Sequence, residues 1–222
     1  MTNTMQNYTG VKLKSVIDCN KNHNPLIKKK LREVSVEEGL AIATELFQIH
    51  NERKDGIGLA ANQVGIDAQV AVVNVTEPLV LINPKYIKKE VEIMYGEGCL
   101  SYPNQAIRTK RYRDVIIKTA QSESGWYFSG AKIPADESRG SWEVERKNKD
   151  SELRLLEAVC VQHEIDHLNG ITIHDREIKL EPTKSEKKIG RNQLVTIKKG
   201  DAVKVLKYKK AHNLLNQGWV ME

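Results

Sequence analysis

The chain has 222 residues, of which 40% are hydrophobic and 29% are charged. This composition is typical of a globular protein, and it excludes collagen-like, low-complexity and wholly disordered chains. Aromatic residues make up only 5%, so the core must rest on aliphatic side chains. The length suits one large domain, or one domain with a small appendage.

The formal net charge of +6 taken alone suggests a nucleic-acid-binding protein. The excess is confined to one end, because residues 184–222 carry ten Lys or Arg and three Asp or Glu, a net +7. Residues 1–183 carry 25 basic and 26 acidic side chains, a net −1. We therefore predict a main domain over 1–183 and a basic extension over 184–222, and the main domain shows no nucleic-acid signature.

The cysteine spacing and the lengths of the apolar runs indicate the cellular compartment of the protein. The three cysteines, Cys19, Cys99 and Cys160, are an odd number at wide spacing, which argues against a disulfide framework and favours a reducing compartment. No apolar run approaches the length that crosses a bilayer, and the first ten residues lack the layout of a signal peptide. We expect a cytoplasmic monomer that does not enter a membrane.

In chain order, residues 1–24 are predicted as a short strand or loop, and Ser35 is predicted to open a helix with Glu38 completing a capping box. Turn residues at 54–56 should end this helix. Its predicted core-facing residues, at helical spacing, are Leu40, Ala43, Leu46 and Phe47.

The middle of the chain is richer in strand patterns. Apolar, β-branched runs predict strands at 70–75, 79–82, 91–94 and 115–119, with a glycine-flanked turn at 96–101. Residues 121–150 are polar, but the aromatic run 126–128 suggests a packed hairpin. A second helix is predicted from 150 or 151, with Gly170 as its C′ residue, followed by a strand at 171–173.

The C-terminal extension has its own pattern. Strands at 194–197 and 203–208 read as a hairpin, and a short final helix should present Ala211, Leu214, Leu215 and Trp219 on one face. Over the whole chain, strands and helices are mixed without regular β–α alternation. This favours an α+β fold with mostly antiparallel sheet.

The sharpest chemical signal is HEIDH at residues 163–167. On a helix, His163 and His167 project from one face and can reach one metal ion, while Glu164 lies beside them to handle a proton. A catalytic metal usually has a third protein ligand. The candidates for that ligand are Cys99, Cys160, Asp166, His174 and Asp175.

The two cysteines are the main rivals for that position. Cys160 shares the face of His163 but lies one turn earlier, too far along the axis to close a compact site, and its apolar neighbours also suit simple packing. Cys99 lies in a glycine-flanked turn that could place its thiol against the helix. The residues alone leave the choice open.

A third segment, GIGLAANQ at residues 56–63, permits close backbone approach. It lacks the ending of a P-loop and the spacing of a dinucleotide-binding turn. Gln63 could offer an amide donor to an oxygen that becomes negative during a reaction.

Taken in order, GIGLAANQ, EGCLS at 97–101 and HEIDH resemble the three motifs of the peptide deformylases. The resemblance covers about residues 25–178. It implies antiparallel sheets wrapped around a central helix that bears HEIDH. The small β-hairpin and helix predicted for the extension lie outside the resemblance. It also implies an enzyme that removes the N-formyl group from the formyl-methionine of nascent polypeptides and releases formate.

The resemblance also implies a metal centre. Cys99, His163 and His167 would hold one divalent ion, with a water in the fourth position. Iron(II) is the usual physiological metal of the family, and zinc, nickel or cobalt can replace it. The thiolate ligand distinguishes this family from typical HExxH peptidases.

The same resemblance implies roles around the metal. Glu164 would take the proton of the water and deliver it to the leaving amine. Gln63 and the backbone N–H of Leu100 would hold the oxyanion. The residues expected to bind the extended substrate and its methionine are Ile57, Gly58, Val159 and Cys160.

Some features depart from the family pattern. Asn62 occupies a position often held by Pro, and residues 102–104 read Tyr-Pro-Asn instead of the commoner Val/Ile-Pro-Gly. The span before the HEIDH helix is about twenty residues longer than usual. Its aromatic run 126–128 could cap the substrate groove, but we favour plain packing.

Two further hypotheses stay open from the sequence. The same HEIDH could serve a zinc endopeptidase, which would have a third ligand other than Cys99. By analogy with deformylases that dock on the ribosome through a basic C-terminal helix, the extension could contact ribosomal RNA or protein. A solvated charged hairpin is the simpler alternative.

Overall fold

The computed structural model describes residues 14–53, 55–130, 143–145, 151–179, 190–215 and 218–221. The chain divides into two units, Met1–Ile178 and Lys179–Glu222, and the boundary predicted from charge lies five residues further on, after residue 183. Each unit is described by itself. Within the described ranges, no helix combines the length and the apolar character that a membrane span needs.

Within its described residues, the first unit contains two helices, two sheets and two short 3₁₀ turns. In chain order these are α1 (Val36–Glu52), β1 (Gly58–Ala60), η1 (Ala61–Val64), β2 (Val70–Asn74), β3 (Pro78–Ile82), β4 (Lys85–Cys99), β5 (Tyr102–Lys118), β6 (Gly125–Ser129), β7 (Glu143–Glu145), α2 (Ser151–Leu168) and η2 (Ile173–Arg176). The sheets have the orders β1-β2-β3 and β4-β5-β6-β7. All neighbours pair antiparallel except β6 and β7, which are parallel. The predicted mixed fold with mostly antiparallel sheet is therefore confirmed.

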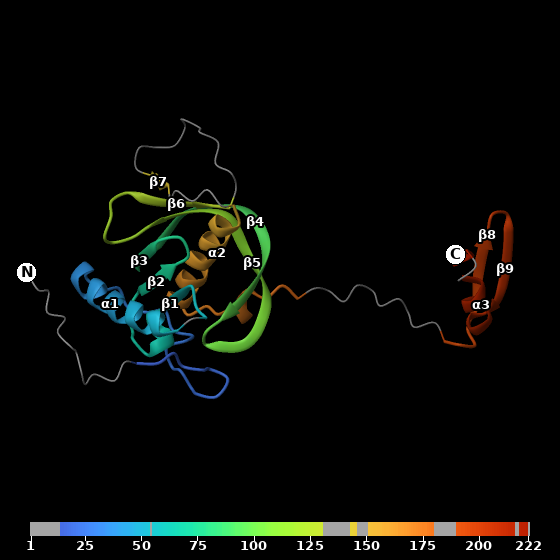
Figure 1. The fold of residues 1–222 in the computed structure, drawn as a ribbon, viewed down its shortest axis with the longest axis horizontal. Coiled ribbons are helices and arrows are strands. Elements are labelled where there is room, and N and C mark those ends of the chain that lie inside the picture. The colour runs from blue at the N-terminus through green and yellow to red at the C-terminus, as the bar shows by residue number, and fades with distance from the viewer. Residues whose placement is uncertain are drawn as a thin grey trace, which may run out of the picture. The chain divides into compact units, whose positions relative to one another are not determined.

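Helix α2 contacts both sheets, through β1 and β2 on one side and through β5 and β6 on the other. In Figure 1 it lies as a gold helix between the teal strands β1–β3 and the green β4–β5 ribbon. Its buried side chains join a core formed by residues of all these elements, including Ala71, Val73, Val115, Ile117, Phe128, Val161, Ile165 and Leu168. Because apolar packing fixes α2 along most of its length, the polar residues that it carries are held in defined positions.

The start of α1 follows the prediction in part. Ser35 is the N-cap, and its Oγ accepts a hydrogen bond of 3.2 Å from the backbone N–H of Glu38. The carboxylate of Glu38 does not complete the capping box, because it pairs with the guanidinium of Arg32. An ion pair with the preceding loop replaces the expected reciprocal bond.

The inward face of α1 is rotated relative to the prediction. Leu40 is 49% exposed, so its assignment to the core is wrong. Gly39 lies close to the sheet, since a Cβ there would be 2.7 Å from Cδ1 of Ile82. This close approach turns Leu40 outward. The other predicted core residues of α1 do pack inward: Ala43, Leu46 and Phe47.

Several strand predictions were correct in place but wrong in length. The runs 70–75 and 79–82 correspond to β2 and β3. The run 91–94 is only part of β4, and 115–119 covers only the last four residues of β5, which ends at Lys118. Most of the predicted turn 96–101 belongs to β4, and the turn itself is Leu100–Ser101. Lys and Glu on the exposed face of this ribbon hide its strand character from a pattern of apolar residues.

Two other predictions are decided by the structure. The aromatic run 126–128 lies in β6, and Phe128 is 2% exposed within the core, so the packing alternative is correct. The predicted strand at 171–173 is wrong, because Ile173 begins η2. The side chain of Asp175 accepts hydrogen bonds from Thr172, which favours a turn there.

The second unit contains β8 (Leu194–Lys199), β9 (Ala202–Lys207), α3 (Tyr208–Leu215) and β10 (Val220–Met221). The predicted hairpin is confirmed, with Gly200 at φ +58° in its turn and β10 added on the other side of β8. Ile197 and Ala211 are fully buried. Trp219 lies beyond the end of α3, contrary to the prediction, and Lys204 stacks over its ring.

Candidate active site and metal centre

Helix α2 brings His163 and His167 together, with ring centroids 4.9 Å apart. Cys99 ends β4, and its Sγ lies 3.3 Å from Nε2 of His167. The ligand atoms of these three side chains lie within 4.8 Å of one another, and no other group of this kind occurs among the described residues. One thiolate and two imidazoles suit a borderline divalent cation. The donor set therefore fits one metal ion, and Cys160, Asp166, His174 and Asp175 lie outside it.

The charges of this cluster are coupled. Burial opposes ionisation of Cys99, but His167 and His163 lower the pKa of its thiol well below the ordinary value. Burial also opposes protonation of His163, whereas Cys99 and Glu97 raise the pKa of its imidazole well above the ordinary value. The thiol and the imidazole thus each favour the charged form of the other.

A network of buried, charged side chains is hydrogen-bonded to His163. Glu97 accepts a hydrogen bond of 2.8 Å from Nδ1 of His163 and one of 2.9 Å from Nη2 of Arg111. Arg111 also pairs with Asp166, which accepts further hydrogen bonds from Arg176. Although burial opposes it, His163 and Arg111 lower the pKa of Glu97 to about 2. In the sequence, Glu97 belongs to the EGCLS motif but has no predicted role, because side-chain pairings between distant segments leave no local signal.

Glu164 lies beside the cluster and is 3% exposed. Burial raises its pKa to about 7, helped by Cys99 and opposed by the histidines. Its Oε2 has no hydrogen-bond partner within the described part of the chain. A Cβ at Gly58 would overlap this carboxylate and would lie 2.8 Å from Sγ of Cys160. A carboxyl group with a pKa near neutral pH, one oxygen of which has no hydrogen-bond partner among the described residues, is suited to act as a general base.

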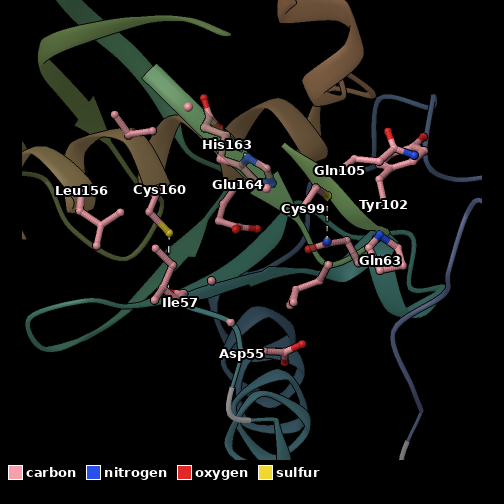
Figure 2. Close-up of a pocket in the computed structure, with 18 of the residues that line it drawn as sticks. Asp55, Ile57, Gln63, Cys99, Tyr102, Gln105, Leu156, Cys160, His163 and Glu164 are labelled. Carbon is pink, nitrogen blue, oxygen red and sulfur yellow. Dashed lines mark hydrogen bonds and ion pairs between the residues drawn. The ribbon is translucent and has the colours of Figure 1, made fainter. Parts of the chain in front are cut away.

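Gln63 approaches the cluster from η1 and is 1% exposed. Its Oε1 accepts a hydrogen bond of 2.9 Å from the N–H of Ala60, which fixes the amide orientation. Its Nε2 lies 3.3 Å from Oγ of Ser101 and 3.7 Å from Sγ of Cys99. Figure 2 shows this amide directed at Cys99 from the side opposite α2.

A cavity of about 490 Å³ opens onto these groups. All the residues predicted for the site line it except His167, which is 1% exposed beneath the others. The lining residues that were not predicted from the sequence include Arg53, Asp55, Leu156, Tyr95, Asn104 and Gln105. Leu156 could have been found, because it precedes Cys160 by four residues on the same helix face. Figure 2 shows Asp55 and Gln105 among the side chains that line the cavity.

Gly58, the first residue of β1, lines the cavity, and β1 is an edge strand of its sheet. The carbonyl of Ile57 accepts a hydrogen bond of 2.8 Å from the N–H of Asn74, the last residue of β2. Because successive residues of a strand direct their backbone groups to opposite sides, those of Gly58 face away from β2. An extended chain could pair with this edge.

The Tyr-Pro-Asn departure has a local explanation. Asn104 has φ +63°, a left-handed conformation that Asn tolerates better than most residues and that suits the Gly it replaces. Tyr102 packs edge-on against His174, with ring centroids 4.7 Å apart.

The family model described as polypeptide deformylase matches residues 17–129 and 141–183. The chain belongs to the peptide deformylase family. It is 37% identical over 148 residues to the peptide deformylase of Pseudoalteromonas translucida, covering 65% of this chain and 74% of that protein. To the peptide deformylase of Wolinella succinogenes it is 32% identical over 184 residues, covering 78% of this chain and 95% of that protein.

Solved deformylase structures share the fold. The actinonin-bound deformylase of Acinetobacter baumannii aligns with a TM-score of 0.56 and 26% identity, over 75% of this chain and 99% of that one. The deformylase of Thermotoga maritima aligns with a TM-score of 0.55 and 24% identity, over 76% of this chain and 100% of that one. The chain is therefore a metal-dependent hydrolase that removes the N-formyl group from nascent polypeptides, and the endopeptidase alternative is not favoured.

Proposed function

We propose that Cys99, His163 and His167 hold one divalent metal ion and that Glu164 is the general base of deformylation. The observation that carries this proposal is the three ligand atoms within 4.8 Å of one another, in the cavity wall beside a carboxyl group with a pKa of about 7. We take iron(II) as the native metal, with zinc, nickel and cobalt as replacements. Metal analysis of anaerobically purified protein tests this choice.

A metal ion held by Cys99, His163 and His167 would polarise the formyl carbonyl and lower the pKa of the attacking water. Glu164 accepts the proton of that water and delivers it to the nitrogen of the breaking C–N bond, so that formate and a free amine leave. The oxygen of the formyl group becomes negative as the water adds. The Nε2 of Gln63 and the backbone N–H of Leu100 donate hydrogen bonds to it.

The substrate lies extended along the free edge of β1 and pairs with the backbone of Gly58 next to Ile57. Its methionine side chain enters the part of the cavity bounded by α2, where Val159 and Cys160 are 2% and 5% exposed. Cys160 donates a weak hydrogen bond to the carbonyl of Ile57, 3.6 Å away, which supports a role in the wall of this pocket. Leu156 extends the same wall.

Formate release from a formyl-methionyl peptide tests the activity directly, with casein digestion measured alongside. We expect formate and no cleavage of internal peptide bonds. Proteolysis without formate would contradict the proposal and restore the endopeptidase hypothesis.

We also propose that the basic second unit docks the enzyme on the ribosome, where its substrate emerges. Charge supports this, because Lys198, Lys207 and Lys209 are exposed and the extension carries a net +7. Reversal of these three lysines to Glu should lower co-sedimentation with ribosomes at moderate salt. The matched control reverses exposed lysines of the first unit, Lys85, Lys88 and Lys118. Equal pelleting of both triple variants would favour a merely solvated hairpin.

The free state of the described cysteines, Cys19, Cys99 and Cys160, supports our proposal of a cytoplasmic enzyme.

We also propose that the protein is a monomer, and light scattering after size-exclusion chromatography measures its mass. A doubled mass would contradict this.

A further inference from the structure

The turn that carries Gln63 is joined to the end of α2 by the side chain of Asn62. Nδ2 of Asn62 donates a hydrogen bond of 2.7 Å to the backbone carbonyl of His167 and one of 3.3 Å to that of Leu26. Asn62 is fully buried. The Asn62 side chain therefore links the turn that carries Gln63, the proposed oxyanion donor, to the backbone of His167, a proposed metal ligand.

The N-terminal loop holds Asn62 from the other side. Nδ2 of Asn24 donates a hydrogen bond of 2.8 Å to the backbone carbonyl of Asn62, and the N–H of Ile17 donates one of 2.8 Å to the carbonyl of Gln63. Asn24 is 4% exposed. The η1 turn is thus fixed between this loop and α2.

Helix termination does not explain the bond to His167. The carbonyl of His167 already accepts a hydrogen bond of 3.1 Å from the N–H of Gly170, which has φ +71° and closes the helix end. The helix end is therefore satisfied without Asn62. A Pro, which often stands at this position in the family, would stiffen the turn but has no group that could reach the helix.

We propose that Asn62 is a positioning residue that sets the distance between the amide of Gln63 and the metal centre. Gln63 approaches Cys99 from η1 while His167 comes from α2, so their relation depends on how η1 and α2 are joined. A misplacement of about 1 Å in a catalytic group can cost on the order of 100-fold in rate. The inference rests on the proposed role of Gln63, and its test separates the two.

The test variant is Asn62→Asp, which keeps the shape but replaces the donor with an oxygen facing two carbonyls. We expect kcat to fall about tenfold or more while KM stays within about twofold, because the substrate edge at Gly58 is untouched. In the cobalt-substituted protein we expect a shift of the thiolate-to-cobalt charge-transfer band, because the Gln63 amide lies 3.7 Å from Sγ of Cys99.

The matched control is Asn83→Asp. This variant removes a partly buried hydrogen bond of 2.8 Å from the Asn83 amide to the carbonyl of Val34, outside the cavity. It should lower Tm without changing kcat or the band.

A double-mutant cycle with Gln63→Ala decides between positioning and general loosening. If Asn62 acts through Gln63, Asn62→Asp should lower kcat much less in the Gln63→Ala background than in the wild type. The same factor in both backgrounds, or an unchanged kcat and cobalt spectrum in Asn62→Asp alone, would overturn the inference. A near-normal kcat in Gln63→Ala alone would instead remove the role of Gln63, and with it the basis of the inference.

A second route protects the test against misfolding. If Asn62→Asp does not fold at the assay temperature, Asn24→Asp removes the donor to the carbonyl of Asn62 and keeps the acceptor that the N–H of Leu26 uses. We expect a smaller fall in kcat that disappears in the Gln63→Ala background. A fall that persists there, or no fall, counts against the inference.

Discussion

A carboxylate oxygen of Glu97 lies 2.8 Å from Nδ1 of His163, so Nε2 is the nitrogen of this imidazole left for a metal ion. The same carboxylate favours the protonated imidazole when no cation is present, and together with Cys99 it raises the pKa of His163 well above the ordinary value. A proton and a metal ion therefore compete for this side chain.

Metal binding should release protons near neutral pH. The imidazolium of His163 must lose its proton to become a ligand, and a cation should also favour the ionised form of Glu164, whose pKa burial raises to about 7. We expect about one proton or more released per metal at pH 7. Apparent metal affinity should fall as pH falls, because the competing protonated form gains population. Calorimetry in two buffers of different ionisation enthalpy measures the number, and a value of zero would contradict this account.

The two candidate thiol ligands are separated by substitution. Cys99→Ala should lose metal and activity together, since its thiolate is the proposed ligand. Cys160→Ala should keep the metal, because burial and the nearby Glu164 raise the pKa of Cys160 and keep it a thiol. Metal content after gel filtration is the measurement. If Cys160→Ala is the metal-free variant, the ligand assignment is wrong.

Glu164→Gln removes the proposed base without changing its shape. We expect kcat to fall by about 100- to 10,000-fold, the usual contribution of general acid–base catalysis. The metal should remain bound, because Glu164 lies outside the three-ligand cluster. Formate release and metal content are measured on the same sample. A variant with nearly normal kcat would show that another group takes the proton.

The parts of the site that could be predicted from the residues alone are the local ones. His163 and His167 share a helix face whatever the tertiary fold, so their pairing follows from spacing. Cys99 reaches them only because the β4–β5 ribbon turns at residues 100–101, and the family resemblance, not the spacing, indicated it. The bonds from Glu97 to Arg111 and from Asn62 to His167 join distant segments, and nothing in the local sequence announces them.

The space beside Glu164 predicts a sharp effect at Gly58. Alanine there would overlap the Glu164 carboxylate, so either that group or β1 must move, and we expect at least a tenfold loss of kcat/KM. Gly96 is the matched control, because it also lines the cavity and a Cβ there would meet nothing within 4 Å. Gly96→Ala should keep its activity. Similar losses in the two variants would show that the fit around Glu164 is not the cause.

The buried charges behind His163 predict a difference in stability between two arginines. Arg111 has a side chain 3% exposed between Glu97 and Asp166, and Arg111→Met would leave both carboxylates without it. Loss of one partner from a buried ion pair costs about 3–5 kcal/mol of unfolding free energy. Arg113, 39% exposed and paired with Asp114, is the control, and Arg113→Met should cost less than about 1 kcal/mol. Urea unfolding of the metal-free proteins measures both values. Equal losses would mean that the network contributes no more to stability than a surface pair.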